Sequence, residues 1–245
     1  MAYTTRLTPK LSDSVTQMMW MTSWLILDLC ETRLLYVRTL SDIYRSVNAT
    51  FLDPDKPSSL TFARLIMCTA TAEKERMPAF DKHNLPTELN ANRLIRHYLS
   101  HFHCLYPAFN ETTLWSASAA VYTRRPTAYQ SWLFFMTLAI SSSSQSSTAN
   151  DQNYKTGVDY VAHALHYANE VLLPHLATQL PALVLLIEYS LLDPTHFDSW
   201  QLIGYACRSL VELGYHLDPP KDHTLTKDDL NRRRQLFFCI FSLDR

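Results

Sequence analysis

Glycine is scarce in this chain of 245 residues, which contains only Gly157, Gly204 and Gly214. Rossmann, P-loop and nucleophile-elbow sites each need glycines clustered at a turn, where the backbone must bend sharply or approach a phosphate closely. The three glycines are too far apart to build any of these sites. An all-β chain with many tight turns is disfavoured for the same reason. The sequence therefore predicts an all-α, multi-helix domain.

The chain also lacks an excess of charge of either sign and a pair of closely spaced cysteines. Its formal net charge is -1, whereas a domain that binds nucleic acid through its own field usually carries a basic excess. We therefore expect no direct contact between this chain and nucleic acid. No two of the cysteines lie within four residues of each other, which excludes the spacing of a structural zinc site. These cysteines are Cys30, Cys68, Cys104, Cys207 and Cys239.

No segment has the pattern of a signal peptide or a membrane span. Residues 1–13 are polar, and we expect them to form a flexible tail. The stretch from Met18 to Cys30 is strongly apolar but falls short of the roughly 18 apolar residues that a membrane span requires. We therefore expect no membrane contact, and we assign residues 14–84 to N-terminal helices and linkers that pack on a domain over residues 85–245.

Apolar residues at helical spacing and prolines between them predict where the helices lie. Thr87 is expected to cap a helix that buries Ala91, Leu94, Ile95, Tyr98 and Phe102 on one face. The run of serines over 141–147 is interpreted as a polar surface loop, with phosphorylation of its serines as the alternative. The predicted helices are Ser14–Val47, Leu60–Lys74, Thr87–His103, Thr112–Tyr122, Tyr129–Ile140, Tyr154–Val171 and Leu180–Leu192.

The last third of the chain is predicted to form a pair of packed helices. Asp193 and Pro194 suit the start of the first helix, and Gly214 suits a left-handed cap at its end. Trp200, Ile203, Cys207, Leu210 and Val211 share one face of this helix, with Gly204 in its middle, where glycine usually marks the close approach of another helix.

The second helix of this pair is predicted to begin at Thr226, which has capping-box spacing to Asp229. Leu230, Phe237 and Phe241 define its expected buried stripe, and helical periodicity places Arg234 and Asp244 on the same stripe. Buried charges must be paired, since an unpaired one costs several kcal/mol. We therefore predict an ion pair between Asp244 and Arg208, with solvent exposure of these charges as the alternative.

Two blocks of this sequence resemble the middle homology region of fungal zinc-cluster transcription factors. The first contains a tyrosine, a histidine five residues later and an aromatic–proline pair; these are Tyr98, His103, Tyr106 and Pro107. The second matches over the final helix pair, at Trp200, Gly204, Ala206, Arg208, Leu213, Gly214, His216, Asp218, Pro219, Arg234, Leu236, Asp244 and Arg245. Gln235 and Phe238 depart from the arginine and tryptophan that are common in the family.

The resemblance implies a regulatory region of a nuclear transcription factor that modulates DNA-templated transcription and is not an enzyme. Its partners would be a second copy, a transcriptional co-regulator or a small-molecule effector. The family's zinc and DNA contacts come from an N-terminal cysteine cluster that is absent here, so we expect no cofactor, metal ligand or DNA contact in this chain. Family members continue past the Asp–Arg pair, so we expect a domain that is incomplete at its C-terminus.

Three alternatives remain open from the residues alone. His97, His101 and His103 could hold a metal ion, although no suitably spaced carboxylate accompanies them. An all-α enzyme acting on small molecules is the catalytic rival, but the aspartates lack the spacing of a magnesium motif. A dimerisation or co-repressor scaffold without a ligand is the third alternative. The basic run Arg232–Arg234 could serve DNA or nuclear import, although we interpret it as structural.

Overall fold

The computed structural model describes residues 62–72, 74–75, 85–123, 125–148, 151–174, 176–217 and 225–245. The chain divides into two compact units, 1–57 and 58–245, and the described residues all belong to the second. The predicted tail over 1–13 and the predicted helix Ser14–Val47 lie outside the described residues.

Within the described residues the structure is helical and contains no strand, as the sequence predicts. The helices are α2 (Phe62–Ala70), α3 (Glu88–His101), α4 (Glu111–Tyr122), α5 (Ala128–Ser144), α6 (Gln152–Leu165), α7 (Ala168–Val171), α8 (Gln179–Leu192), α9 (Ser199–Glu212) and α10 (Lys227–Asp244).

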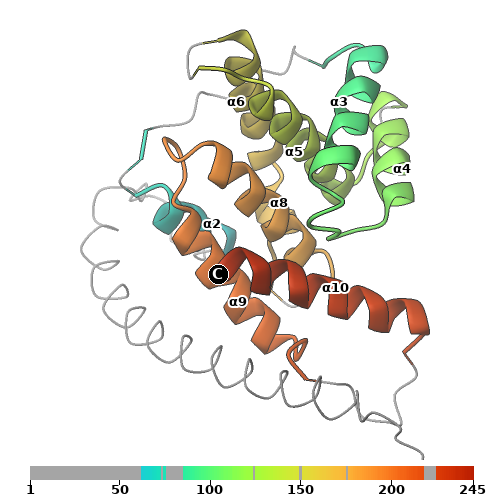
Figure 1. Cartoon of the computed structure of the whole chain (residues 1–245), viewed down its shortest axis with the longest axis vertical. Helices are drawn as coiled ribbons and strands as arrows, with labels where there is room; N and C mark the ends of the chain where they lie inside the picture. Colours follow the sequence, from blue (N-terminus) through green and yellow to red (C-terminus); the bar gives the residue numbers. More distant parts are fainter. Residues whose placement is uncertain are drawn as a thin grey trace, which may run out of the picture. The chain divides into compact units, whose positions relative to one another are not determined.

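Helix α5 is the centre of the described unit. It packs against α3, α4, α6, α7 and α8 (Figure 1). Every residue from Ser131 to Ser143 is buried, which is the pattern of a helix surrounded by other helices. Its start is fixed by a capping box in which Thr127 and Gln130 each bind the other's backbone N–H.

The serine run that follows Ile140 is not the surface loop that the sequence suggested. Helix α5 continues to Ser144, and Ser141, Ser142 and Ser143 are buried. Ser141 Oγ donates to the carbonyl oxygen of Leu94 at 2.7 Å, and Ser142 Oγ donates to that of Asn153 at 2.8 Å. The hydroxyl groups thus satisfy buried carbonyl groups, so polar residues can extend an apolar helix into the core.

Helix α6 approaches α5 closely because Gly157 has no side chain. A Cβ atom at Gly157 would overlap Ser143 Oγ and lie 3.2 Å from the carbonyl oxygen of Ala139. The predicted single helix Tyr154–Val171 is divided by a turn, since α6 ends at Leu165 and α7 begins at Ala168.

The segment between α8 and α9 differs from the prediction. Asp193 does not begin a helix: it follows the end of α8, and α9 is capped instead by Asp198, whose Oδ1 accepts from the N–H groups of Trp200 and Gln201. The intervening segment is held to α2, since Asp198 donates its N–H to the carbonyl oxygen of Ala70 at 2.8 Å. The carboxyl group of Asp193 therefore does not cap a helix, and its contacts are described with the candidate site below.

The end of α9 is as predicted. Gly214 has φ +68°, the left-handed conformation that favours glycine. Tyr215 donates its N–H to the carbonyl oxygen of Leu210 and Gly214 donates to that of Val211, which together form a Schellman cap. Arg233 of α10 then donates to the carbonyl oxygen of Gly214 at 2.7 Å and stacks over the ring of Tyr215. One arginine thus ties α10 to the end of α9.

Helix α10 packs on α9 and α8, and the C-terminus lies at its end (Figure 1). Thr226 caps it, as predicted, by accepting from the N–H of Asp229. Its buried residues are Leu236, Phe237, Cys239 and Ile240. This face is rotated from the predicted stripe, so Arg234 is exposed rather than buried, whereas Arg233 lies at the edge of the buried face.

Candidate functional site

The first block of family-motif residues forms an aromatic cluster at the C-terminal end of α3. Tyr98 is buried and stacks on Phe102 and Phe109, while the ring of His103 lies 5.0 Å from that of Phe109. Burial lowers the pKa of His103, against the opposing effect of Glu111. Tyr106 and Pro107 are half-buried in the turn that follows. These four residues therefore shape the connection from α3 to α4.

The second block is spread along α9 and α10. Gly204 is buried within α9, while Trp200, expected on the buried face, is 46 % exposed. His216 is half-buried beyond the Gly214 cap, and burial together with Arg233 lowers its pKa. Arg245 is exposed and lies over the ring of Phe241.

The structure gives Arg208 partners other than the predicted Asp244. Its Nε donates to the carbonyl oxygen of Gly204 at 3.2 Å, and its guanidinium group lies 4.3 Å from the centre of the Tyr205 ring. Asp244 is half-buried near the end of α10. These two contacts of Arg208 lie within α9, whereas Arg233 bonds from α10 to the end of α9.

Tyr98 contacts a buried carboxyl group, that of Glu188, which the sequence analysis did not identify. Tyr98 Oη donates to Glu188 Oε2 at 3.0 Å, which joins α3 to α8. Glu188 Oε1 is buried and has no hydrogen-bond partner. Burial raises the pKa of Glu188 to about 8, and the hydrogen bond from Tyr98 acts in the opposite direction. The carboxyl group is therefore mostly neutral at pH 7.

Two further titratable groups surround this pair. Cys239 of α10 is buried, and burial followed by the charge of Glu188 raises its pKa to about 12. Burial also raises the pKa of Tyr129, in the first turn of α5, to about 12. For Tyr98, burial and then Glu188 are the main causes of a raised pKa, with Cys239 and Tyr129 contributing less. We call Tyr98, Tyr129, Glu188 and Cys239 the Glu188 cluster; each comes from a different helix.

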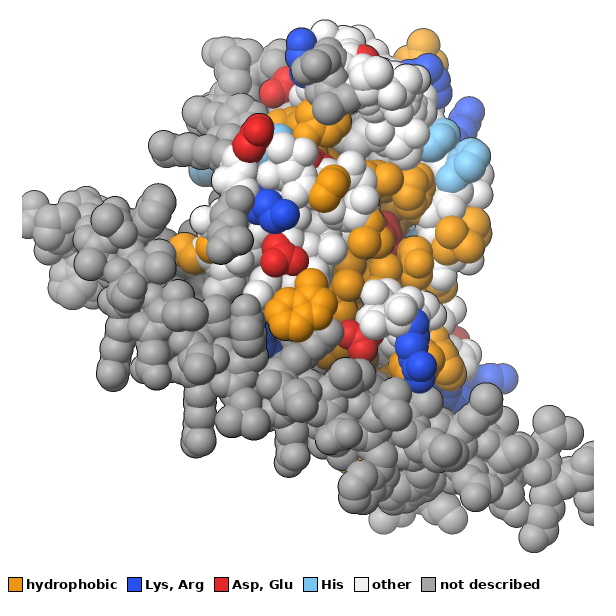
Figure 2. Space-filling view, turned by 60° about the vertical axis from the view of Figure 1, so that its left-hand side comes forward, with side chains coloured by type: hydrophobic (Ala, Val, Ile, Leu, Met, Phe, Trp, Pro, Cys, Tyr) orange, Lys and Arg blue, Asp and Glu red, His pale blue; other side chains and the backbone are white. Residues whose placement is uncertain are grey.

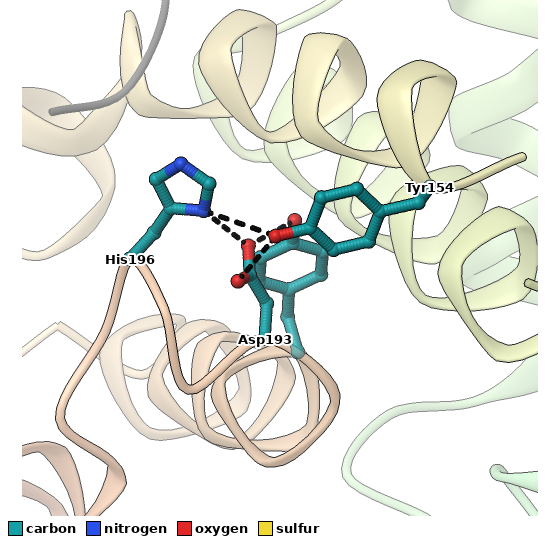
Figure 3. A network of polar contacts seen from close by, with 4 residues as sticks. Tyr154, Asp193 and His196 are labelled. Atoms are coloured by element: carbon teal, nitrogen blue, oxygen red, sulfur yellow. Dashed lines mark hydrogen bonds and ion pairs between the residues drawn. The ribbon is translucent and has the colours of Figure 1, made fainter. Parts of the chain in front are cut away.

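A second buried carboxyl group, that of Asp193, has three partners. Tyr154 donates to its Oδ1 at 2.9 Å, Tyr189 donates to its Oδ2 at 2.8 Å, and His196 Nδ1 lies 2.8 Å from the same Oδ2. Figure 3 shows Tyr154 reaching from α6 toward Asp193 and His196, which follow α8 in the chain. We call these four residues the Asp193 network; it joins α6, α8 and the segment leading to α9.

The three histidines considered as metal ligands are arranged differently. The rings of His97 and His101 stack with their centres 4.3 Å apart, and His101 Nδ1 lies 2.9 Å from the carbonyl oxygen of His97. His103 points into the aromatic cluster described above. Within the part of the chain that the structure describes, no group of three or more His, Cys, Asp or Glu residues is arranged to hold a metal ion.

Glu188 could have been found in the sequence. It is the only charged residue in an otherwise apolar helix, α8, and a buried charge in such a helix needs either a partner or neutralisation. The Asp193 network has no comparable signal, because Tyr154 is 39 residues away from Asp193 and Asp193–Pro194 has the pattern of a helix start. Most side chains of the two clusters are buried, and their hydrogen bonds join different helices.

Several large apolar side chains nevertheless remain on the surface. Leu89 and Leu105, at the two ends of the α3 region, are 84 % and 66 % exposed, and Phe238 of α10 is 56 % exposed. Figure 2 shows hydrophobic side chains gathered over part of one face of the molecule, with histidine side chains at the edge. Exposed apolar surface of this kind is typical of protein interaction sites.

Comparison of the chain with known protein families gave one match, which is consistent with the all-helical fold. A family model described as the fungal specific transcription factor domain matches residues 95–245, which is more than half of the chain. No curated protein and no solved structure was found that matches the chain. Among the described residues, no helix is both long and apolar enough to cross a membrane. The match includes α10 and nearly all of the helices whose contacts are set out above, and the chain therefore belongs to the fungal specific transcription factor domain family.

Proposed function

We propose that this chain is the part of a transcription factor that regulates activity without itself contacting DNA, and that it acts in the nucleus. The family match over residues 95–245 carries this proposal, since it indicates a transcription factor regulatory region. The mechanism that we propose is an equilibrium between different packings of the helices. An effector or partner shifts such an equilibrium only by binding one packing better than another.

The charge distribution supports the absence of DNA contact. The chain has 22 Lys and Arg residues against 23 Asp and Glu residues, whereas a DNA-binding domain neutralises phosphates with an excess of basic groups. The one basic run, Arg232–Arg234, is partly engaged, because Arg233 donates to the end of α9. We therefore propose that DNA recognition depends on another module.

The test is to fuse residues 1–245 to a heterologous DNA-binding module and measure transcription of a reporter with the matching site. We expect the fusion to change reporter output relative to the module alone, and a fluorescent fusion to accumulate in the nucleus. The matched control is the same fusion with Asp193→Ala, which disrupts helix packing. An unchanged reporter would contradict the regulatory role.

A mobility-shift assay on the unfused chain tests the second part of the proposal. We expect no band shift with varied DNA sequences at physiological salt. Tight, salt-sensitive binding would show that the chain reads DNA directly. Turnover of a small molecule by the purified chain would instead support the enzymatic alternative.

A dimerisation scaffold is the second candidate, and the exposure of Phe238 favours it. Its ring packs edge-on against Phe237 but leaves the side chain 56 % exposed, as is typical of an interaction surface. Light scattering on the wild-type chain and on Phe238→Ser would test this role, with Ser242→Ala, on an exposed position of the same helix, as the control. A dimer that only Phe238→Ser weakens would support it, and a monomeric wild type would exclude it.

A further inference from the structure

We propose that the outer face of α3 is a docking surface for an acidic partner segment that also carries apolar side chains. Four exposed residues at helical spacing form the centre of this face, and we call them the α3 stripe: Leu89, Arg93, Arg96 and Ser100. The inference rests on the proposed function and deepens it, because it names the surface at which the regulatory region meets a partner and the chemistry of that partner.

The α3 stripe lies opposite the buried face of the helix. Its successive members are four, three and four residues apart, so they fall on one side of α3, while the buried residues of this helix fall on the other. Among the described helices, the main packing partner of α3 is α5, and α3 lies at the periphery of the unit (Figure 1). At a rise of about 1.5 Å per residue the stripe is about 16 Å long, which matches about three turns of a partner helix.

The middle of the stripe carries two charges that the protein itself does not neutralise. Among the described residues, the guanidinium groups of Arg93 and Arg96 have no hydrogen-bond acceptor and no ion-pair partner. Helix α3 contains one acidic residue, Glu88, which lies to the side of the stripe. Burial lowers the pKa of His97, and the neighbouring charges of His101 and Arg93 lower it further. The field over this face is therefore positive, although the net charge of the chain is -1.

Exposed leucines lie on either side of the two arginines. Leu85 and Leu89 are 47 % and 84 % exposed at the start of α3, and Leu105 is 66 % exposed in the turn that follows it. A single exposed leucine needs no explanation, but apolar side chains at both ends of a charged centre are typical of an interaction surface. Exposed ion pairs contribute little by themselves, so contacts with the leucines are needed to hold a partner.

The chemistry of the partner follows from these two features. Planar guanidinium groups bind carboxylates through two parallel hydrogen bonds, so aspartate or glutamate side chains match the centre of the stripe. Apolar side chains before and after these carboxylates match the leucines. DNA is a poorer match, because its phosphates are bound by many basic groups and offer the leucines no apolar contact. A protein segment is therefore the occupant that this surface suits.

The test is a selection of displayed random peptides, long enough to span the stripe, on the full 245-residue chain. Peptides that also bind Arg93→Glu/Arg96→Glu are removed by counter-selection. The matched control is Lys155→Glu/Arg232→Glu, which changes the net charge equally at exposed positions of α6 and α10. We expect the enriched peptides to combine Asp or Glu with Leu, Ile or Phe, and to bind the control variant as they bind the wild type.

Fluorescence anisotropy of one labelled enriched peptide then measures its affinity. We expect Arg93→Glu/Arg96→Glu to weaken binding by about tenfold or more, because two attractive contacts become repulsive. Leu89→Ser should weaken it by about threefold or more through lost apolar contact. Binding should also weaken when the ionic strength rises from about 0.1 M to about 1 M, since the arginines are exposed.

Three results would overturn the docking surface. The first is that no peptide is enriched, or that the enriched peptides have no excess of acidic residues. The second is equal affinity of the peptide for the wild type and Arg93→Glu/Arg96→Glu. The third is binding of labelled DNA to the wild type that this variant loses, because the stripe would then contact nucleic acid.

If the charge-reversed variant does not fold by circular dichroism, Arg93→Gln/Arg96→Gln carries the test, because it removes both charges and adds none. Unchanged affinity in that variant would count against the docking surface. Failure here and failure of the proposed function are distinguishable. Peptide binding is measured on the purified chain, whereas the reporter assay measures transcription, so an active reporter fusion without an acidic peptide partner would refute the docking surface alone.

Discussion

The two buried carboxyl groups of this domain have opposite surroundings. Asp193 accepts from two tyrosine hydroxyls and contacts His196, so both of its oxygens have partners. Glu188 has one donor and one oxygen with no hydrogen bond. Both groups join helices that are distant in the sequence. The comparison shows that two carboxyl groups that are both buried differ in the number of hydroxyl donors that reach them, two at Asp193 and one at Glu188.

The largest expected effect comes from removing the carboxyl group at the centre of the Asp193 network. Asp193→Ala leaves the hydroxyls of Tyr154 and Tyr189 without their acceptor, and we expect a loss of about 3–5 kcal/mol in the free energy of unfolding. Urea denaturation measures this loss. Asp159→Ala, at an exposed position of α6, is the matched control and should change little. A loss below about 1 kcal/mol for Asp193→Ala would show that the network contributes little to stability.

The second prediction concerns the pH dependence that Glu188 gives to folding. Because its folded pKa is raised to about 8 from 4.5, its contribution is fully present below pH 4.5 and is lost as the pH rises toward 8. At about 1.4 kcal/mol per unit of pKa shift, we expect the wild type to lose about 2–4 kcal/mol relative to Glu188→Gln between pH 5 and 8. Denaturation of both proteins across this range measures the difference, and parallel curves would contradict it.

The third prediction concerns the close approach of α6 to α5 at Gly157. Gly157→Ala places a methyl group against Ser143 Oγ and the carbonyl oxygen of Ala139, and we expect a loss of about 1–3 kcal/mol from overpacking. Adding Ser143→Ala should recover part of this loss, because the overlapping hydroxyl group is then absent. Thermal unfolding of the single and double variants gives both values. Full stability of Gly157→Ala would show that the helices separate at no cost.

The smallest expected effects on stability come from replacing one tyrosine at each of the two carboxyl groups, Asp193 and Glu188. Tyr154→Phe removes one of several contacts to Asp193, whereas Tyr98→Phe removes the one donor that the described residues supply to Glu188. Each should lose about 1 kcal/mol near neutral pH. Only Tyr98→Phe should change the pH dependence of stability, by raising the pKa of Glu188 further. An equal change of pH dependence in both variants would remove the distinction between the sites.

Local signals in the sequence predicted much of the fold. The left-handed cap at Gly214 and the cap at Thr226 followed from residue types that suit those positions, and both are present. The apolar run of α5 was also predicted, but its serine extension was not. Hydrophobicity alone does not show that Ser141 will meet the carbonyl group of Leu94 across a helix interface.

Long-range polar contacts were the least predictable part. Asp193 has the local pattern of a helix cap, and its actual partner Tyr154 is 39 residues away. Arg234 and Arg233 differ by one position, but the rotation of α10 exposes the first and brings the second to the end of α9. Arg208, for which a contact with Asp244 was predicted, lies against the ring of Tyr205 in its own helix. These outcomes depend on how helices meet, which periodicity does not specify.

The most direct measurement is a carbon-13 NMR titration of the side-chain carboxyl groups of glutamate in the full chain. The Glu188 resonance is identified as the one missing from Glu188→Gln. We expect its midpoint near pH 8, well above the usual range of a glutamate side chain. A midpoint between pH 4 and 5 would show that the carboxyl group is ionised in the folded protein at neutral pH, and would contradict the neutral state of Glu188.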